Sequence, residues 1–76
     1  MSWEDRITVD PKILAGKPVI AGTRISVELI LDLLAAGWTW ENLLTGYPQL
    51  SDDDLRAAVA YAAMVVKGEQ AHPIGT

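Results

Sequence analysis

The chain has 76 residues, no cysteine and a formal net charge of −4, and 50% of its residues are hydrophobic. A chain of this length holds one domain, because a core this small cannot be divided into two. The lack of cysteine excludes disulfides and thiol catalysis and agrees with a cytoplasmic location, while the acidic balance disfavours a large sequence-independent affinity for nucleic acid.

Membrane association is not expected from this sequence. No apolar run approaches the ~20 residues of a membrane-spanning helix, and the first six residues, MSWEDR, lack the basic and then apolar order of a signal peptide. The hydrophobic share is nevertheless high for a small soluble chain. We therefore expect something besides the monomer core to cover part of the apolar surface.

The N-terminal part predicts a two-stranded β arm over residues 6–25, after a loose end at residues 1–5. Residues 6–9 alternate polar and apolar side chains, which is typical of a short strand. Pro18 removes a backbone donor, so Val19 and Ile20 are expected to form an edge strand that pairs back with the first. Gly22 permits a tight reversal before the first helix. Because a lone ribbon is unstable in water, the arm must lie on the helices or pair with a second copy.

Three helices are predicted over residues 27–36, 40–45 and 52–67, which together form a core over residues 26–67. Each has a Ser or Thr N-cap between two apolar residues that can form a hydrophobic staple. Glycines are expected to end them. Residues 68–76 lose all periodicity and are predicted to be a flexible tail. The N-caps are Ser26, Thr39 and Ser51, and the stops are Gly37, Gly46 and Gly68.

The first and third helices are unusually apolar. In the third, apolar side chains cover an arc of roughly 200°, about twice what a surface helix needs. A three-helix monomer cannot hide two such arcs, so we expect an obligate homodimer or higher oligomer, or a complex with a partner. The predicted interface centres on Ala57, Tyr61, Met64 and Val65, with the edge strand Val19-Ile20 pairing between copies.

The sequence has few residues in patterns that could carry out catalysis. We therefore predict a protein that is not an enzyme and has no cofactor or metal. The only histidine, His72, falls in the predicted tail. Asp52, Asp53 and Asp54 are consecutive, so they point in different directions, and acids are ordinary in the first turn of a helix. Gly16-Lys17 lacks both the upstream glycine and the following Ser or Thr of a phosphate-binding loop.

The order of the helices also fits a helix-turn-helix whose reading helix is residues 52–67. Three aspartates at the start of that helix would face the phosphates, with only Arg56 nearby, so DNA reading by this end is disfavoured. Four of the remaining cations lie in the arm, where any nucleic-acid contact is expected. They are Arg6, Lys12, Lys17 and Arg24.

The segment 16–25, GKPVIAGTRI, is either a connector or a binding loop. This segment resembles the signature of domain-of-unknown-function family 433, DUF433. The other segments that match are Asp10-Pro11, residues 47–50 (YPQL) and the alanines and tyrosine of residues 57–62. The resemblance covers about four-fifths of the chain, from Ile7 to Val66.

That resemblance implies a mainly α, homeodomain-like three-helix domain, related to the helix-turn-helix, with a short β arm. It also implies an antitoxin that binds a toxin protein, often a nuclease of the PIN type, and DNA as a further candidate partner. The family supplies no catalytic residues. Lys17, Thr23 and Arg24 match its signature and are candidate contacts. The alternative function is a stand-alone dimeric DNA-binding regulator.

Overall fold

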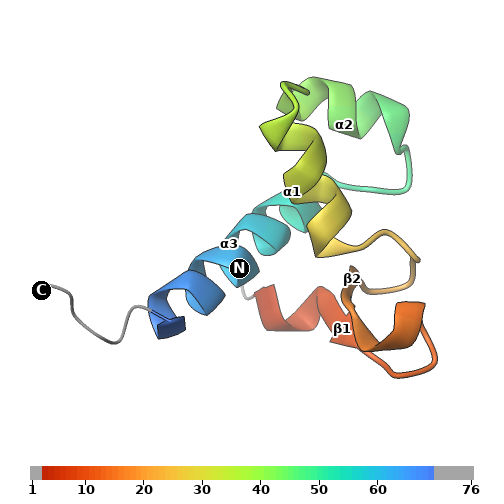
Figure 1. Ribbon diagram of the computed structural model, residues 1–76. Helices are drawn as coiled ribbons and strands as arrows, with labels where there is room; N and C mark the ends of the chain where they lie inside the picture. Colours follow the sequence, from red (N-terminus) through yellow and green to blue (C-terminus); the bar gives the residue numbers. More distant parts are fainter. Residues whose placement is uncertain (1–2, 70–76) are drawn as a thin grey trace, which may run out of the picture.

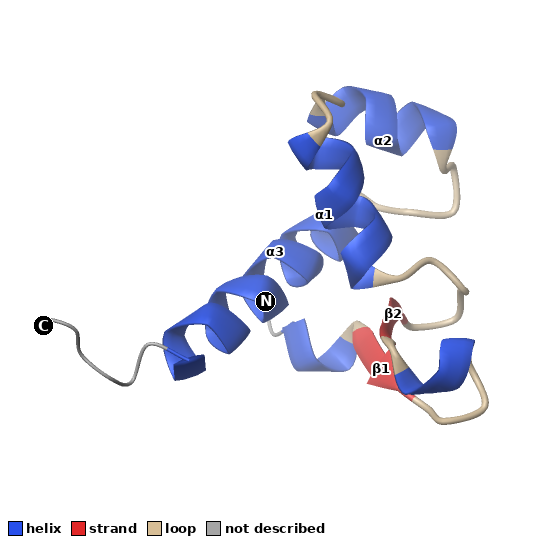
Figure 2. Ribbon diagram, viewed as in Figure 1, coloured by secondary structure: helices blue, strands red, loops and turns tan. Residues whose placement is uncertain are grey.

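The computed structural model describes residues 3–69 and is mainly helical, with a two-stranded antiparallel sheet near the N-terminus (Figures 1 and 2). This confirms the predicted fold class. No helix in residues 3–69 is long and apolar enough to cross a membrane. The elements in order are the 3-10 turn η1 (Trp3–Asp5), β1 (Ile7–Val9), the 3-10 turn η2 (Leu14–Gly16), β2 (Pro18–Ile20), α1 (Val27–Ala35), α2 (Trp40–Gly46) and α3 (Asp52–Glu69).

The two strands pair as predicted, with Ile7 opposite Ile20 and Val9 opposite Pro18. The second edge of β2 is not free, however. Val19 forms a bridge with Ser26, and the backbone N–H of Ile20 donates to the Ile25 carbonyl at 2.9 Å. The prediction of an unprotected edge at Val19 and Ile20 is therefore wrong, because the chain after Gly22 turns back and covers it.

All three predicted N-caps are confirmed. Ser26 Oγ accepts from the Leu29 N–H at 2.9 Å. Thr39 and Ser51 each form a reciprocal capping box, with Asn42 and Asp54. These bonds satisfy backbone donors that the first turn of a helix leaves without partners.

Of the three predicted glycine stops, the one at Gly68 is wrong, Gly46 is confirmed as the residue where α2 ends, and Gly37 is confirmed as well. It follows α1 with φ of +103°, a conformation that glycine adopts without steric cost. Gly46 is itself the last residue of α2, one residue past the predicted end at Thr45, whereas Gly68 lies inside α3, so the predicted end at Lys67 is wrong. A glycine permits a helix to end but does not force it to, and neither of these two has a positive φ. Residues 70–76, which hold most of the predicted tail and His72, lie outside the described residues.

The second strand and all three α-helices contribute to the core. The largest fully buried side chains are Val19 and Ile20 from β2, Ile30 from α1, Leu43 from α2 and Leu55 from α3. Burying each such side chain contributes roughly 1.5–3 kcal/mol to stability.

The first helix packs most of its apolar arc against the rest of the chain. Val27 and Ile30 are buried, and the four leucines of α1 are half-buried and packed on the core. The expectation that both apolar helices exceed what the monomer can cover is thus wrong for most of α1, because this helix packs against α3 and β2. Only α3 retains a large apolar surface.

The expected loose end at residues 1–5 is wrong for residues 3–5. They form η1, which packs against α3. The Trp3 ring meets Tyr61 edge-on, with centroids 5.3 Å apart. This contact holds η1 against the middle of α3, the longest helix.

Candidate functional site

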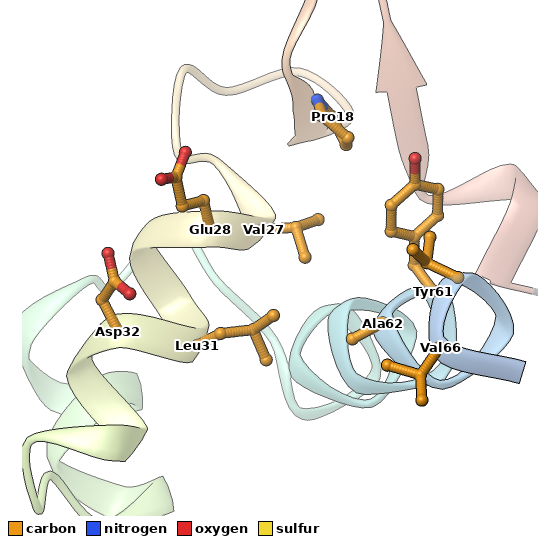
Figure 3. A pocket seen from close by; sticks show the side chains of 9 residues that line it. Pro18, Val27, Glu28, Leu31, Asp32, Tyr61, Ala62 and Val66 are labelled. Atoms are coloured by element: carbon orange, nitrogen blue, oxygen red, sulfur yellow. The ribbon is translucent and has the colours of Figure 1, made fainter. Parts of the chain in front are cut away.

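A largely apolar groove of about 320 Å³ runs between α1 and α3 (Figure 3). Val27 and Leu31 point across it from α1 towards Ala62 and Val66 on α3. Pro18 and Tyr61 close one end. The lining, named here the α1–α3 groove, consists of Pro18, Val27, Glu28, Leu31, Asp32, Tyr61, Ala62, Val65 and Val66.

Helical spacing explains why the groove exists. Val27 and Leu31 are four residues apart on α1, and Ala62 and Val66 four apart on α3, so each pair lies on one face of its helix. Ala62 has only a methyl group and leaves a depression between larger neighbours. The two helices therefore face one another across a trough that no other described element covers.

One edge of the groove is acidic. The carboxylates of Glu28 and Asp32 extend from the outer side of α1, away from the apolar floor (Figure 3). Lys17 Nζ donates to Glu28 Oε1 at 2.9 Å, which partly neutralises that carboxylate. Asp32 forms no ion pair within residues 3–69. We name these two carboxylates the acidic rim.

The C-terminal part of α3 extends past the other elements and stays uncovered (Figure 1). Met64, Val65 and Val66, named here the projecting end, are 43%, 39% and 52% exposed. A helix that is apolar on all sides is normally buried, so this segment is unusual for an isolated chain.

The structure separates the four residues predicted for the oligomer interface. Met64 and Val65 lie on the surface as expected, and Tyr61 is half-buried against Trp3. Ala57 is fully buried in the core of its own chain and offers no surface to a partner. Periodicity marked the apolar arc correctly but could not tell which part of it this chain covers itself.

The family-signature residues have unequal roles. Thr23 Oγ1 donates to the Ile20 carbonyl at 2.8 Å and accepts from the Ile25 N–H at 3.0 Å, so Thr23 holds the turn after β2. Lys17 pairs with Glu28. Arg24 is exposed and has no ion pair in the described part of the chain. Of the three, Arg24 is the one whose side chain remains available to an external partner.

The three aspartates that open α3 hold neighbouring elements. Asp52 accepts from Trp40 Nε1 at 2.6 Å and from Arg56 Nε at 2.8 Å, and the pKa of its carboxyl is lowered, mainly by the Arg56 hydrogen bond and then by Trp40. Arg6 pairs with Asp54 at 3.0 Å and with Asp53 at 3.6 Å. Within residues 3–69, no cluster of acidic or histidine side chains is arranged to hold a metal ion.

These contacts also occupy much of the chain's positive charge. Arg6, Lys17 and Arg56 are each paired with an acid of the same chain. A paired cation gains less from meeting a phosphate, because it must first give up its own partner. Arg56, the cation closest to the start of α3, is therefore less available to bind DNA, which weakens the helix-turn-helix interpretation.

Comparisons with known proteins give a consistent result. A family model described as "Protein of unknown function (DUF433)" matches residues 7–62. The uncharacterized protein y4eO of Sinorhizobium fredii (strain NBRC 101917 / NGR234) is 39% identical over 56 residues, 74% of this chain and 25% of y4eO. The chain thus spans about a quarter of the length of that relative.

A solved structure is also similar. The crystal structure of a DUF433 member protein from Anabaena variabilis ATCC 29413 superposes with a TM-score of 0.78 and 29% identity, covering 91% of this chain and 71% of that one. The arrangement of arm and helices therefore recurs in a second protein.

Proposed function

This chain belongs to DUF433, a family of proteins of unknown function, and on that premise we propose that it is a non-enzymatic module that binds another protein. The observation that carries the proposal is the uncovered apolar surface of α3, made of the projecting end and the adjoining α1–α3 groove. A surface of this kind normally marks an interface. In its specific form, the module is a cytoplasmic antitoxin whose partner is a nuclease toxin of the PIN type, as the family resemblance implies.

Co-expression with the neighbouring reading frame tests this function. We expect the neighbour to be toxic alone, and to be neutralised in a complex that co-purifies with this chain. Val66→Lys places a charge on the uncovered surface of α3 and should weaken the complex. Glu41→Lys, on the exposed side of α2, is the matched control and should not. An inert neighbour that forms no complex would refute the antitoxin proposal.

A second candidate is a stand-alone DNA-binding regulator that works as a dimer. It is favoured by Arg24, which is exposed beside the signature turn and has no ion pair within residues 3–69, and by the order of α1, α2 and α3. A gel-shift on the upstream region, at low and at physiological salt, separates the two. Binding without a partner that weakens in Arg24→Ala would support the regulator, and no shift even at low salt would count against it.

A further inference from the structure

We propose that the α1–α3 groove binds an amphipathic helix of a partner protein, with basic side chains along the edge that meets Glu28 and Asp32. This inference rests on the proposed protein-binding function and adds the shape and charge of the bound segment. It assigns the groove, rather than the whole uncovered surface of α3, to that partner.

The helical form follows from the backbone on both sides of the groove. The walls are α1 and α3, whose internal N–H and C=O groups are already bonded within each helix. Pro18 has no N–H, and the far edge of β2 is covered by Ser26. An extended segment in the groove would thus find few backbone partners, and unpaired peptide groups are costly against apolar side chains. A helix satisfies its own backbone and presents only side chains.

The apolar stripe of the partner follows from the lining. The floor and facing walls are formed by Val27, Leu31, Ala62 and Val66 (Figure 3). An amphipathic helix brings apolar side chains to one face at positions i, i+3, i+4 and i+7. Two or three of these would fill the trough over Ala62.

The basic edge follows from the acidic rim. Glu28 and Asp32 are four residues apart, so their carboxylates lie about one turn apart along the same side of α1. Of these two carboxylates, Glu28 has a cation beside it, Lys17. Asp32 is left without an ion pair within residues 3–69, at the edge of an apolar surface. A Lys or Arg of the bound helix would complement it and would favour basic segments over acidic ones.

Charge also argues against a second copy of this chain as the occupant. Each copy carries a net charge of −4, and Arg6, Lys17 and Arg56 are engaged in their own ion pairs. Among the described helices, the end of α3 is the one part that combines an apolar surface with a cation free of ion pairs. It carries a single such cation, Lys67. A basic helix of a different protein fits the rim better.

Selection from a defined peptide library tests the inference on the full chain. Each displayed helix carries a fixed leucine stripe, with Lys, Glu or Gln varied at the flanking positions. We expect enrichment of peptides with Lys along one flank. Titrated by fluorescence anisotropy, an enriched peptide should bind Val66→Lys about tenfold or more weakly. Ala63→Lys adds the same charge to an exposed position outside the groove and should bind like the parent chain.

A charge exchange then tests the rim itself. Asp32→Lys should weaken the Lys-flanked peptide by about two- to fivefold, the range for an exposed ion pair, and should improve binding of its Glu-flanked counterpart. Glu41→Lys makes the same change of charge away from the groove and should leave the preference unchanged.

Three results would overturn the inference: no enrichment of any helical peptide, enrichment that ignores flank charge, or binding that survives Val66→Lys. Loss of self-association in Val66→Lys would assign the groove to a second copy instead. A neighbour complex that tolerates Val66→Lys would keep the proposed function and overturn the groove assignment alone. Absence of any neighbour complex would refute the antitoxin proposal, while the peptide titrations would still decide what the groove binds.

Discussion

Single polar side chains join segments of this protein that are distant in sequence. Asp52 is the clearest case, since it accepts one hydrogen bond from Trp40 on α2 and another from Arg56 one turn further along α3. Its charge also lies in the first turn of α3, where the helix dipole favours an acid. The same carboxylate therefore stabilises the start of α3 and the turn that brings α2 beside it.

The lowered pKa of Asp52 gives this role a pH dependence. A carboxyl whose folded-state pKa lies below its ordinary value of 3.8 stabilises the fold above that value, and the contribution is lost as the pH falls through the folded-state pKa. We expect Asp52→Asn to lower the Tm at neutral pH, and the difference from the parent chain to shrink as the pH falls below 3.8. Thermal unfolding followed by circular dichroism at several pH values measures this. A difference that stays constant down to the most acidic sample would show that the charge of Asp52 is unimportant.

At the scale of elements, α3 has two sets of supporting contacts, one with the core and one with the N-terminal elements η1 and β1. The core packs against Leu55 and Ala58, and η1 and β1 add further contacts, among them the contact of Trp3 with Tyr61. Beyond Tyr61 neither support continues, and Met64, Val65 and Val66 are all exposed; before Tyr61, Val59 is the exposed large apolar side chain of α3. The N-terminal element η1 therefore contacts α3 just before its exposed end begins.

Removing the Trp3 side chain should loosen the arm from α3. We expect Trp3→Ala to reduce the free energy of unfolding by about 1–3 kcal/mol, because a half-buried aromatic surface and an edge-to-face ring contact are lost. Trp3→Phe keeps an aromatic ring at the position and should cost less. Urea unfolding of the three proteins gives the comparison. Equal stability of Trp3→Ala and the parent chain would mean that η1 rests on α3 without stabilising it.

How well the sequence predicts a feature depends on how far apart in the sequence its interacting residues lie. The N-caps at Ser26, Thr39 and Ser51 were predictable because their signals lie within a few residues of each helix start. The contact of Trp3 with Tyr61 has no local pattern, so residues 3–5 read as a loose end. Periodicity located the apolar surface of α3, but the groove also requires α1 to lie beside it, and that placement depends on the whole fold.

At the scale of the molecule, the described residues build one core, yet the projecting end of α3 adds nothing to it. Val65 and Val66 border the α1–α3 groove, whereas Met64 does not line it. Met64 is two residues from Ala62, which places it roughly 200° around the helix, on the opposite side. The end of α3 thus presents apolar side chains to the groove and also on the side away from Ala62, which leaves Met64 for a homodimer contact while the groove is occupied.

We expect the free protein to be a homodimer that uses the Met64 side of α3. Because the core does not include Met64, Met64→Asp should give a monomer that keeps its helical circular dichroism spectrum. Tyr61→Glu is a poorer test, because it also breaks the contact with Trp3. Light scattering should give twice the chain mass for the parent protein and the single chain mass for Met64→Asp. Lys67→Asp changes an exposed charge nearby and is the control for a nonspecific effect of added acid. A parent protein that is folded and monodisperse as a monomer at micromolar concentration would show that α3 tolerates its exposed end alone, and that only a different protein covers it.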